Sequence, residues 1–238
     1  LSIRRQRQMC IRDSLKPSDT TPESTLVLAE LISEIFPAGV VNIVLGDGQV
    51  GAKVVGHKTP RLVAITGSVR AGRAVAESAA KDLKLTHLEL GGKAPAVVFA
   101  DADLERTAQM LTEFGYFNAG QDCTAVTRVL VEESVAQEFT ALLVKAAKAT
   151  KTGSEVDAEN YYGPLNNVNH FRTVMGKLEN LPEHAVVECG GKQLGEKGFF
   201  IEPTVISGVR QDDPIVQEET FAPVPVSYTH LTLPTNRE

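Results

Sequence analysis

The sequence lacks the features that are typical of membrane-spanning, nucleic-acid-binding and metal-binding proteins. No apolar run approaches the roughly 20 residues needed to span a bilayer. Lysine and arginine number 24 against 30 aspartates and glutamates, giving a net charge of −6. This acidity argues against nucleic-acid and anionic-membrane partners. The histidines are scattered and form no metal pair.

The two ends of the chain resemble the two halves of an inverted DNA repeat. Met9 to Asp13 can be encoded by ATG TGT ATA AGA GAC, and the reverse complement of that string encodes Val226 to His230. Such a pair is typical of translated transposon or adapter DNA. Residues 1–14 and 226–238 are therefore expected to be adapter artefacts outside the fold.

Cysteine is scarce between these ends. Only Cys123 and Cys189 remain, and their positions follow neither metal-ligand nor disulfide spacing. A reducing, cytoplasmic setting is the simplest expectation. Cys189 follows an alternating strand, which favours a packed thiol. Cys123 instead lies in the polar, flexible stretch Tyr116 to Arg128 ("YFNAGQDCTAVTR"), where a thiol is accessible for reaction.

Strand-like and helix-like segments alternate along the first part of the chain. A helix is predicted from Thr21-Pro22-Glu23, with Thr21 as its N-cap, and it should end before Pro37. Strands are predicted at 40–45, 61–65 and 83–90, with an Ala-rich helix before the last one. This β-α alternation indicates a parallel α/β sheet.

The alternation continues after the glycine pair Gly91-Gly92. The pattern predicts, in order, a strand at 95–100, a helix capped by Asp101 and reaching about 115, a strand at 127–131, an amphipathic helix at 134–150, and strands between Leu194 and Val209. The expected division is a domain over 15–90 and a second α/β domain over 91–225.

Two glycine-rich turns connect predicted strands to helices. One is Gly67 to Gly72 (G-x-x-x-x-G), and the other holds Gly46, Gly48 and Gly51. Backbone N–H groups and a helix N-terminus in such a turn can bind phosphate. Neither turn matches the dinucleotide fingerprint G-x-G-x-x-G. Ordinary βα turns and nucleotide binding therefore both remain open.

One carboxylate stands at a strand end before glycines. Glu89, in "LTHLELGGKAP", could act as a general base if it were buried, because burial raises the pKa of a carboxyl group. The alternative is an ordinary solvated acid.

Several segments together resemble the aldehyde dehydrogenase superfamily. They are "KPSDTTP", "ITGSVRAG", "ELGGKAP", "FNAGQDCTAVTR" and "EETFAPV", which occur in that family's order across Leu15 to Pro225. The wording of "THLELGGKAP", "FGYFNAGQDCTA" and "QDDPIVQEE" is most similar to the γ-aminobutyraldehyde (4-aminobutanal) dehydrogenases. The resemblance implies the C-terminal part of a Rossmann-like NAD-binding domain, followed by part of the catalytic α/β domain.

The resemblance implies a role for each reactive side chain. Cys123 matches the nucleophile, whose thiolate attacks the aldehyde to form a thiohemiacetal and then a thioester. Glu89 matches the base that activates water to hydrolyse the thioester. The backbone N–H of Cys123 is expected to bind the oxyanion. Asp122 either attracts the ammonium of an aminoaldehyde substrate or is a loop acid that points to solvent or caps a turn.

The resemblance also implies NAD as the cofactor. Lys16 and Asp19 match positions that hold the adenosine ribose, and a carboxylate there disfavours the 2′-phosphate of NADP. His170 matches a position that often contacts ribose. The remaining matched positions surround the adenine, pyrophosphate and nicotinamide: Gly48, Gly51, Thr66, Gly67, Ser68, Leu90, Glu219 and Phe221.

The sequence departs from the family pattern in three ways. Ile65 replaces a common Phe, Ala222 replaces the usual Gly, and the segment with the second oxyanion donor, an Asn, is missing. Losing one such donor costs about 10²–10³ in rate. The chain alone is expected to be an inactive fragment of a homo-oligomeric enzyme that acts on a small aldehyde. A CoA-acylating enzyme and a catalytically silent NAD-binding relative are the alternatives.

Overall fold

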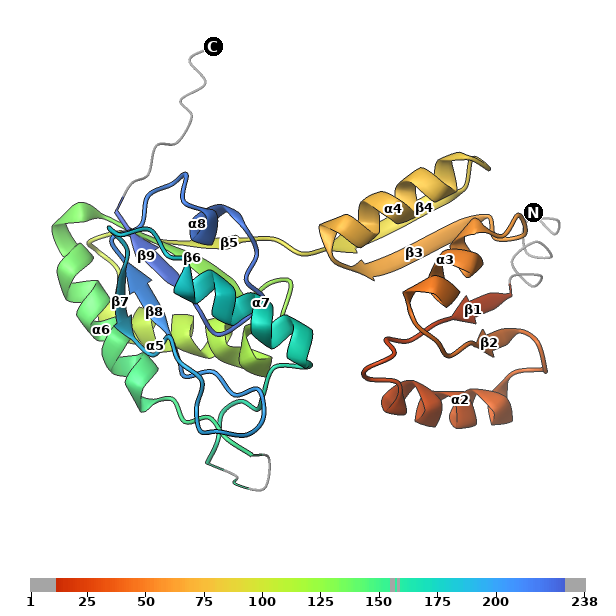
Figure 1. The fold of residues 1–238 in the computed structure, drawn as a ribbon, viewed down its shortest axis with the longest axis horizontal. Coiled ribbons are helices and arrows are strands. Elements are labelled where there is room, and N and C mark those ends of the chain that lie inside the picture. Colours follow the sequence, from red (N-terminus) through yellow and green to blue (C-terminus); the bar gives the residue numbers. More distant parts are fainter. Residues whose placement is uncertain (1–11, 155–156, 158, 230–238) are drawn as a thin grey trace, which may run out of the picture. The chain divides into compact units, whose positions relative to one another are not determined.

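The computed structural model describes residues 12–154, 157 and 159–229 and divides the chain into two compact units, residues 1–90 and 91–238 (Figure 1). Each unit is a mixed α/β structure. Within the described residues, no helix is both long and apolar enough to cross a bilayer.

Unit 1 contains two pairs of parallel strands. The first pair consists of β1 (Asp13–Leu15) and β2 (Val41–Ile43), which are connected by the helix α2 (Glu23–Ile35). The second pair consists of β3 (Leu62–Gly67) and β4 (Leu85–Leu90), which are connected by the helix α4 (Val69–Ala80). The helix α3 (Gly48–Gly56) lies between the pairs in sequence. Parallel strands require such crossover connections.

Unit 2 is built on one five-stranded sheet in the order β5-β6-β9-β8-β7. The strands are β5 (Ala94–Val98), β6 (Val126–Val131), β7 (Val186–Cys189), β8 (Val205–Ser207) and β9 (Val226–Tyr228). The β7–β8 pair is antiparallel, and the other neighbours are parallel.

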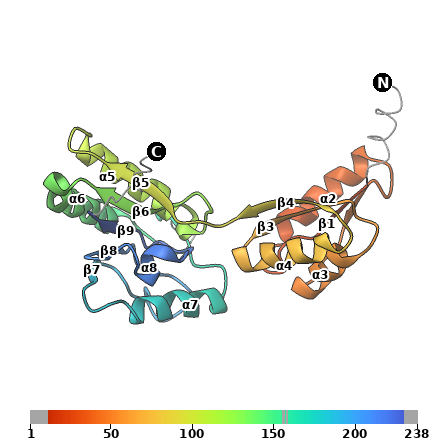
Figure 2. The same ribbon diagram turned by 90° about the horizontal axis from the view of Figure 1, so that it is seen from above.

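Helices cover both sides of the sheet of unit 2. Figure 2 shows α5 and α6 on one side and α7 and α8 on the other. Their bounds are α5 (Leu104–Tyr116), α6 (Ala136–Ala149), α7 (Val168–Glu179) and α8 (Pro214–Gln217), with the 3-10 turns η1 (Phe117–Gly120) and η2 (Glu133–Val135).

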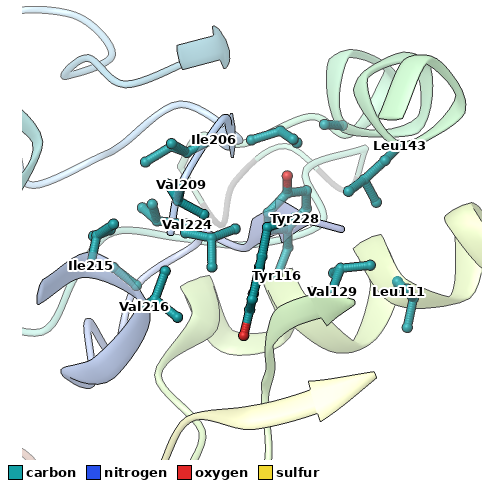
Figure 3. Close-up of a cluster of buried hydrophobic side chains, with 14 of the residues drawn as sticks. Leu111, Tyr116, Val129, Leu143, Ile206, Val209, Ile215, Val216, Val224 and Tyr228 are labelled. Atoms are coloured by element: carbon teal, nitrogen blue, oxygen red, sulfur yellow. The ribbon is translucent and has the colours of Figure 1, made fainter. Parts of the chain in front are cut away.

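The main hydrophobic core lies in unit 2, and Figure 3 shows its centre. In α6, Phe139, Leu143 and Ala147 follow helical spacing and are fully buried. Tyr116 is also fully buried at the end of α5, and its hydroxyl donates to the carbonyl of Thr204 at 3.0 Å. This bond satisfies the one polar atom of a side chain that otherwise packs as an aromatic ring.

Both predicted helix caps were wrong in position. The helix α2 begins at Glu23 after Pro22, and no side chain caps it. The cap of α5 is Asp103, not Asp101, and its carboxylate accepts from the N–H of Arg106 at 3.1 Å. A side chain caps a helix only when it stands directly before the first turn, and several acids near a helix start leave that choice open.

The predicted arrangement of the last strands also needs correction. The sheet is mixed, not wholly parallel, because β7 and β8 form a hairpin-like antiparallel pair. Between Leu194 and Val209 only β8 forms, together with an isolated bridge between Gln193 and Ile201. The helix α7 was not predicted.

The fold continues beyond Pro225, where the sequence predicted it to end. Val226, Ser227 and Tyr228 form β9 between β6 and β8, and all three residues are buried. At the other end, Asp13 and Ser14 pair with Val41 and Asn42. Residues with β-compatible side chains can pair in a sheet whatever the origin of the DNA that encodes them. The observed pairing therefore leaves the adapter origin of both ends as a prediction.

Candidate active site

Cys123 lies just after a sharply bent turn at the end of α5. Three consecutive residues have left-handed backbone angles: Asn118 at φ 51°, Ala119 at φ 58° and Gly120 at φ 68°. A Cβ atom on Gly120 would lie 2.3 Å from the carbonyl oxygen of Ala222, so only glycine fits there. The turn leaves Cys123 exposed.

Side-chain hydrogen bonds hold this turn. The Asn118 amide donates to the Gln121 carbonyl, and the Gln121 amide donates to the Asn118 carbonyl, each at 3.0 Å. The Gln121 side-chain oxygen also accepts from the N–H of Asn166 at 2.8 Å. The residues that looked like a flexible polar loop therefore form a bonded support for the cysteine.

Asp122 caps the turn beside the cysteine. Its carboxylate accepts from the backbone N–H and from the hydroxyl of Thr124, both at 2.8 Å. These two bonds, with a weaker one from Cys123, lower the pKa of Asp122. The turn-capping interpretation of Asp122 is therefore confirmed, and its contact with a substrate stays a prediction.

Glu219 lies against the glycine pair that opens unit 2. Its carboxylate accepts from the N–H of Gly92 at 3.2 Å. A Cβ atom on Gly91 would lie 2.0 Å from the same carboxylate. The missing side chain of Gly91 therefore makes room for the close approach of this acid, whose matched role is to hold a ribose.

Phe221 and His170 are in contact. Phe221 has a left-handed backbone angle, φ 53°, and its carbonyl accepts from Nε2 of His170 at 2.7 Å. The two rings meet edge to face with centroids 6.1 Å apart. Since this bond uses Nε2, the proposed ribose contact of His170 would have to come from another ring atom.

Lys93 is a charged residue of this region that the sequence did not single out. Its ammonium donates to the hydroxyl of Thr220 at 3.2 Å. Burial, together with the nearby positive charges of Lys177 and Arg128, lowers the pKa of Lys93 from 10.5 to about 8. The sequence signal that could have identified Lys93 is its position directly after Gly91-Gly92, the glycine pair that lies against Glu219.

In unit 1, Lys16 lies beside the glycine turn before α3. Its ammonium donates to the carbonyl of Gly46 at 2.8 Å, and a Cβ on Gly51 would lie 3.4 Å from its side chain. Around Gly48 the space is open. The structure thus places the Lys16 side chain beside Gly51, whereas Asp19 stands in an exposed turn.

The N-termini of α3 and α4 in unit 1 differ in charge. At α3, the carboxylate of Asp47 already accepts from the N–H groups of Gln49 and Val50. At α4, the cap is the neutral Ser68, which accepts from Ala71, and no acid lies in the first turn. The N-terminus of α4 therefore fits an anionic group better than that of α3 does.

The register of β3 and β4 places the predicted nucleotide turn beside the predicted base. Thr66 pairs with Glu89, and Gly67 pairs with Leu90, at the carboxyl end of both strands. Glu89 is largely exposed, and its carboxylate lies 2.9 Å from Nε2 of His87. In α/β sheets, this end of the strands is where ligands bind.

The predicted site residues thus form two groups. Unit 1 holds Lys16, Asp19, Gly48, Gly51, Thr66, Gly67, Ser68, Glu89 and Leu90, and unit 2 holds Asp122, Cys123, His170, Glu219 and Phe221. A shared cavity for Cys123 and Glu89 stays a prediction. Cys189 is half-buried, and burial raises the pKa of its thiol, in agreement with a packed role. The described residues contain no group of three His, Cys, Asp or Glu side chains that could hold a metal ion.

The described residues therefore combine an α/β fold with an exposed cysteine on a hydrogen-bonded turn. Residues 14–230 match the aldehyde dehydrogenase family. The chain belongs to that family.

Its relatives include retinal dehydrogenase 2 of Taeniopygia guttata, which is 44% identical over 214 residues, or 88% of this chain and 41% of the relative. A mitochondrial aldehyde dehydrogenase of Leishmania tarentolae is 42% identical over the same share of this chain and 43% of its own length. The chain therefore spans less than half the length of these relatives.

Solved structures of the family share the fold. Lactaldehyde dehydrogenase from Escherichia coli matches with a TM-score of 0.89 and 37% identity, over 93% of this chain and 47% of that one. Betaine aldehyde dehydrogenase from Staphylococcus aureus, solved in complex with NAD+, matches with a TM-score of 0.88 and 37% identity, over 92% and 45%. The Rossmann-like fold class predicted from the sequence is thus confirmed.

Proposed function

We propose that the protein containing this chain oxidises an aldehyde to a carboxylate with NAD, through a thioester on Cys123. The observation that carries the proposal is the exposed Cys123 on a turn of three left-handed residues, in a chain of the aldehyde dehydrogenase family. Such a backbone is sterically costly, and it persists where a side chain must be presented in one position.

Cys123 supplies the nucleophile in this proposal. Its thiolate attacks the aldehyde carbon, and the carbonyl oxygen becomes an oxyanion. The backbone N–H of Cys123 makes no hydrogen bond to any other described residue, so it is available to stabilise that charge. Glu89 accepts a proton from the water that later hydrolyses the thioester and releases the acid.

The residues present fit NAD. NAD, when bound, supplies the acceptor for the hydride that leaves the aldehyde carbon. The acid-free start of α4 at Ser68 suits the pyrophosphate, and the open surface at Gly48 and Gly51 beside Lys16 suits the adenosine. Glu219 and Phe221 in unit 2, with Leu90 in unit 1, are the candidates for holding the nicotinamide riboside.

A small aminoaldehyde such as 4-aminobutanal is the proposed substrate. The support is the wording of three motifs and the carboxylate of Asp122, which its bonds to Thr124 keep ionised. A negative charge next to the nucleophile favours a substrate with an ammonium group. The named relatives act, by their names, on retinal, lactaldehyde and betaine aldehyde, so the aminoaldehyde is this proposal's own choice.

The test uses the parent enzyme at the full length of its relatives. NADH formation is measured with 4-aminobutanal and with uncharged butanal. Cys123→Ser should reduce both rates by about 10³-fold or more. If Cys123→Ser kept both rates of NADH formation, the proposed chemistry would be wrong.

Asp122→Asn tests the substrate choice with the same pair of aldehydes. The KM for 4-aminobutanal should rise about fivefold while the KM for butanal stays unchanged, because an exposed charge pair is worth up to about that factor. Equal changes in KM for both aldehydes would leave Asp122 as a turn cap only.

We also propose that the parent protein is a homo-oligomer in a reducing, cytoplasmic setting. Light scattering tests the oligomeric state, and cell fractionation tests the location.

A further inference from the structure

His87 lies beside the proposed general base on the same strand. Residues 87 and 89 are two apart in β4, so their side chains point to the same face of the sheet. Nε2 of His87 and Oε1 of Glu89 are 2.9 Å apart, within hydrogen-bond distance. The side chains are 65% and 62% exposed.

This contact is the one restraint on the carboxylate of Glu89. Within the described residues, no other side chain and no backbone N–H bonds to the carboxylate of Glu89, and no other group bonds to the imidazole of His87. A free glutamate samples several rotamers, and a single directional bond reduces that freedom. The bond uses only Oε1, so Oε2 stays open.

We infer that His87 is a positioning residue for Glu89, and this inference rests on the proposed function. Nε2–H of His87 donates to Oε1, which aims Oε2 at the attacking water. Oε2 takes one proton from that water, the hydroxide adds to the thioester carbon, and the C–S bond to Cys123 then breaks. The imidazole keeps its own proton throughout.

The role predicts an effect on thioester hydrolysis and none on thioester formation. An activated ester, p-nitrophenyl acetate, separates the two steps in the full-length parent enzyme without NAD. Acetylation of Cys123 releases nitrophenolate in a burst, and hydrolysis of the acetyl-enzyme sets the steady rate. The first step needs no water-activating carboxylate, and the second does.

Two substitutions make a matched pair. His87→Leu removes the donor, and we expect hydrolysis to slow about fivefold, the upper range for an exposed interaction, with an unchanged burst rate. His87→Gln keeps an N–H donor and should stay within about twofold of the unsubstituted enzyme. In a Glu89→Gln background, His87→Leu should have no further effect, because the base that it positions is gone.

The outcomes separate this inference from the proposed function. Equal hydrolysis rates in His87→Leu and the unsubstituted enzyme, or an equal loss in His87→Gln and His87→Leu, overturn the positioning role alone. Absence of acetylation at Cys123 in the unsubstituted enzyme overturns the proposed function and the inference with it. An unchanged burst amplitude in each variant shows that the protein is folded.

Discussion

The two units have similar secondary structure but differ greatly in how much apolar side chain they bury. Among the described residues, the buried hydrophobic side chains of unit 1 are Val63 and Ala79, and all the others belong to unit 2. In α2 no residue is buried, and Leu31 and Ile35 are 55% and 74% exposed. The largest fully buried side chains, such as Leu143 of α6, all belong to unit 2.

The difference shows that regular elements do not by themselves make a stable support. The sheet of unit 2 has helices on both sides, so alternate side chains of its strands are covered. Burial of an apolar side chain contributes about 1.5–3 kcal/mol, and unit 1 has few such contributions. The candidate nucleophile therefore stands on a well-packed unit together with Glu219 and Phe221, whereas Glu89 and the other candidate cofactor residues stand on a sparsely packed one.

The largest expected effect contrasts two leucines. Leu143→Ala should lower the free energy of unfolding of unit 2 by about 2–5 kcal/mol, because it leaves a cavity in a packed core. Leu31→Ala in unit 1 should change that of unit 1 by less than about 0.5 kcal/mol. Urea unfolding followed by circular dichroism measures both free energies. Similar losses of stability in the two variants would contradict the difference in packing between the units.

Two lysines, the buried Lys84 of unit 1 and the half-buried Lys93 of unit 2, extend the comparison to the effect of pH on stability. Lys84 of unit 1 has carbonyl and carboxylate partners, donating to His57 at 2.7 Å and pairing with Asp82 at 3.4 Å. Lys93 of unit 2 lies near Lys177 and Arg128, and its pKa falls to about 8. Between about pH 8 and 10.5 the unfolded chain therefore binds the proton that the folded chain has lost.

Stability from Lys93 should rise with pH across that window. Relative to Lys93→Met, the free energy of unfolding of the unsubstituted chain should increase by about 2–3 kcal/mol between these pH values, at about 1.4 kcal/mol for each pKa unit. Denaturant titrations at a series of pH values measure the difference. Parallel curves for the two proteins would mean that Lys93 keeps its ordinary protonation.

Two tyrosines of unit 2 show whether the burial of a side chain, and not the unit to which it belongs, determines the cost of losing its hydrogen bond. The hydroxyl of the fully buried Tyr116 donates to Thr204, and that of Tyr161, which is 45% exposed, donates to Glu113 at 2.9 Å. Tyr116→Phe should cost about 1–3 kcal/mol, because a buried carbonyl loses its donor. Tyr161→Phe should cost less than about 1 kcal/mol, since water replaces the bond. Thermal unfolding compares them.

The smallest effect concerns one helix cap from each unit. Asp103→Ala and Asp47→Ala each remove a carboxylate that accepts backbone N–H groups, at a cost of about 1 kcal/mol. In unit 2 the loss should appear in global unfolding, because α5 packs in the core. In unit 1 it should appear as faster hydrogen exchange within α3. The same pattern in both helices would contradict a difference in cooperativity between the units.

Much of the fold could be predicted because local patterns matched tertiary needs. The amphipathic pattern of residues 134–150 predicted the helix α6, and the strand-like segment 83–90 predicted β4. The helix α7 was missed because its buried positions, Val174 and Leu178, are few among polar residues. The end of the fold at Pro225 was wrong because the pairing partners of β9 are far away in sequence.

The sequence suggested a chemistry for the candidate site, which stays a prediction, but it did not reveal the contacts within the site. Motifs identified Cys123, Glu89 and Glu219. They did not reveal Lys93 beside Thr220 or His87 beside Glu89, because a hydrogen bond depends on side-chain directions that no motif records. The alternation of β4 was the one available signal for His87.

By itself, the sequence determined the α/β class and the family, and it singled out Cys123 as the candidate nucleophile, because these depend on residue types and on their order. Only the tertiary structure decided that Asp122 caps its own turn, that Gly91 makes room for Glu219, and that unit 2 holds nearly all of the packed core. Those properties depend on which distant atoms come within a few ångströms of one another, and burial and hydrogen bonding act only over that range.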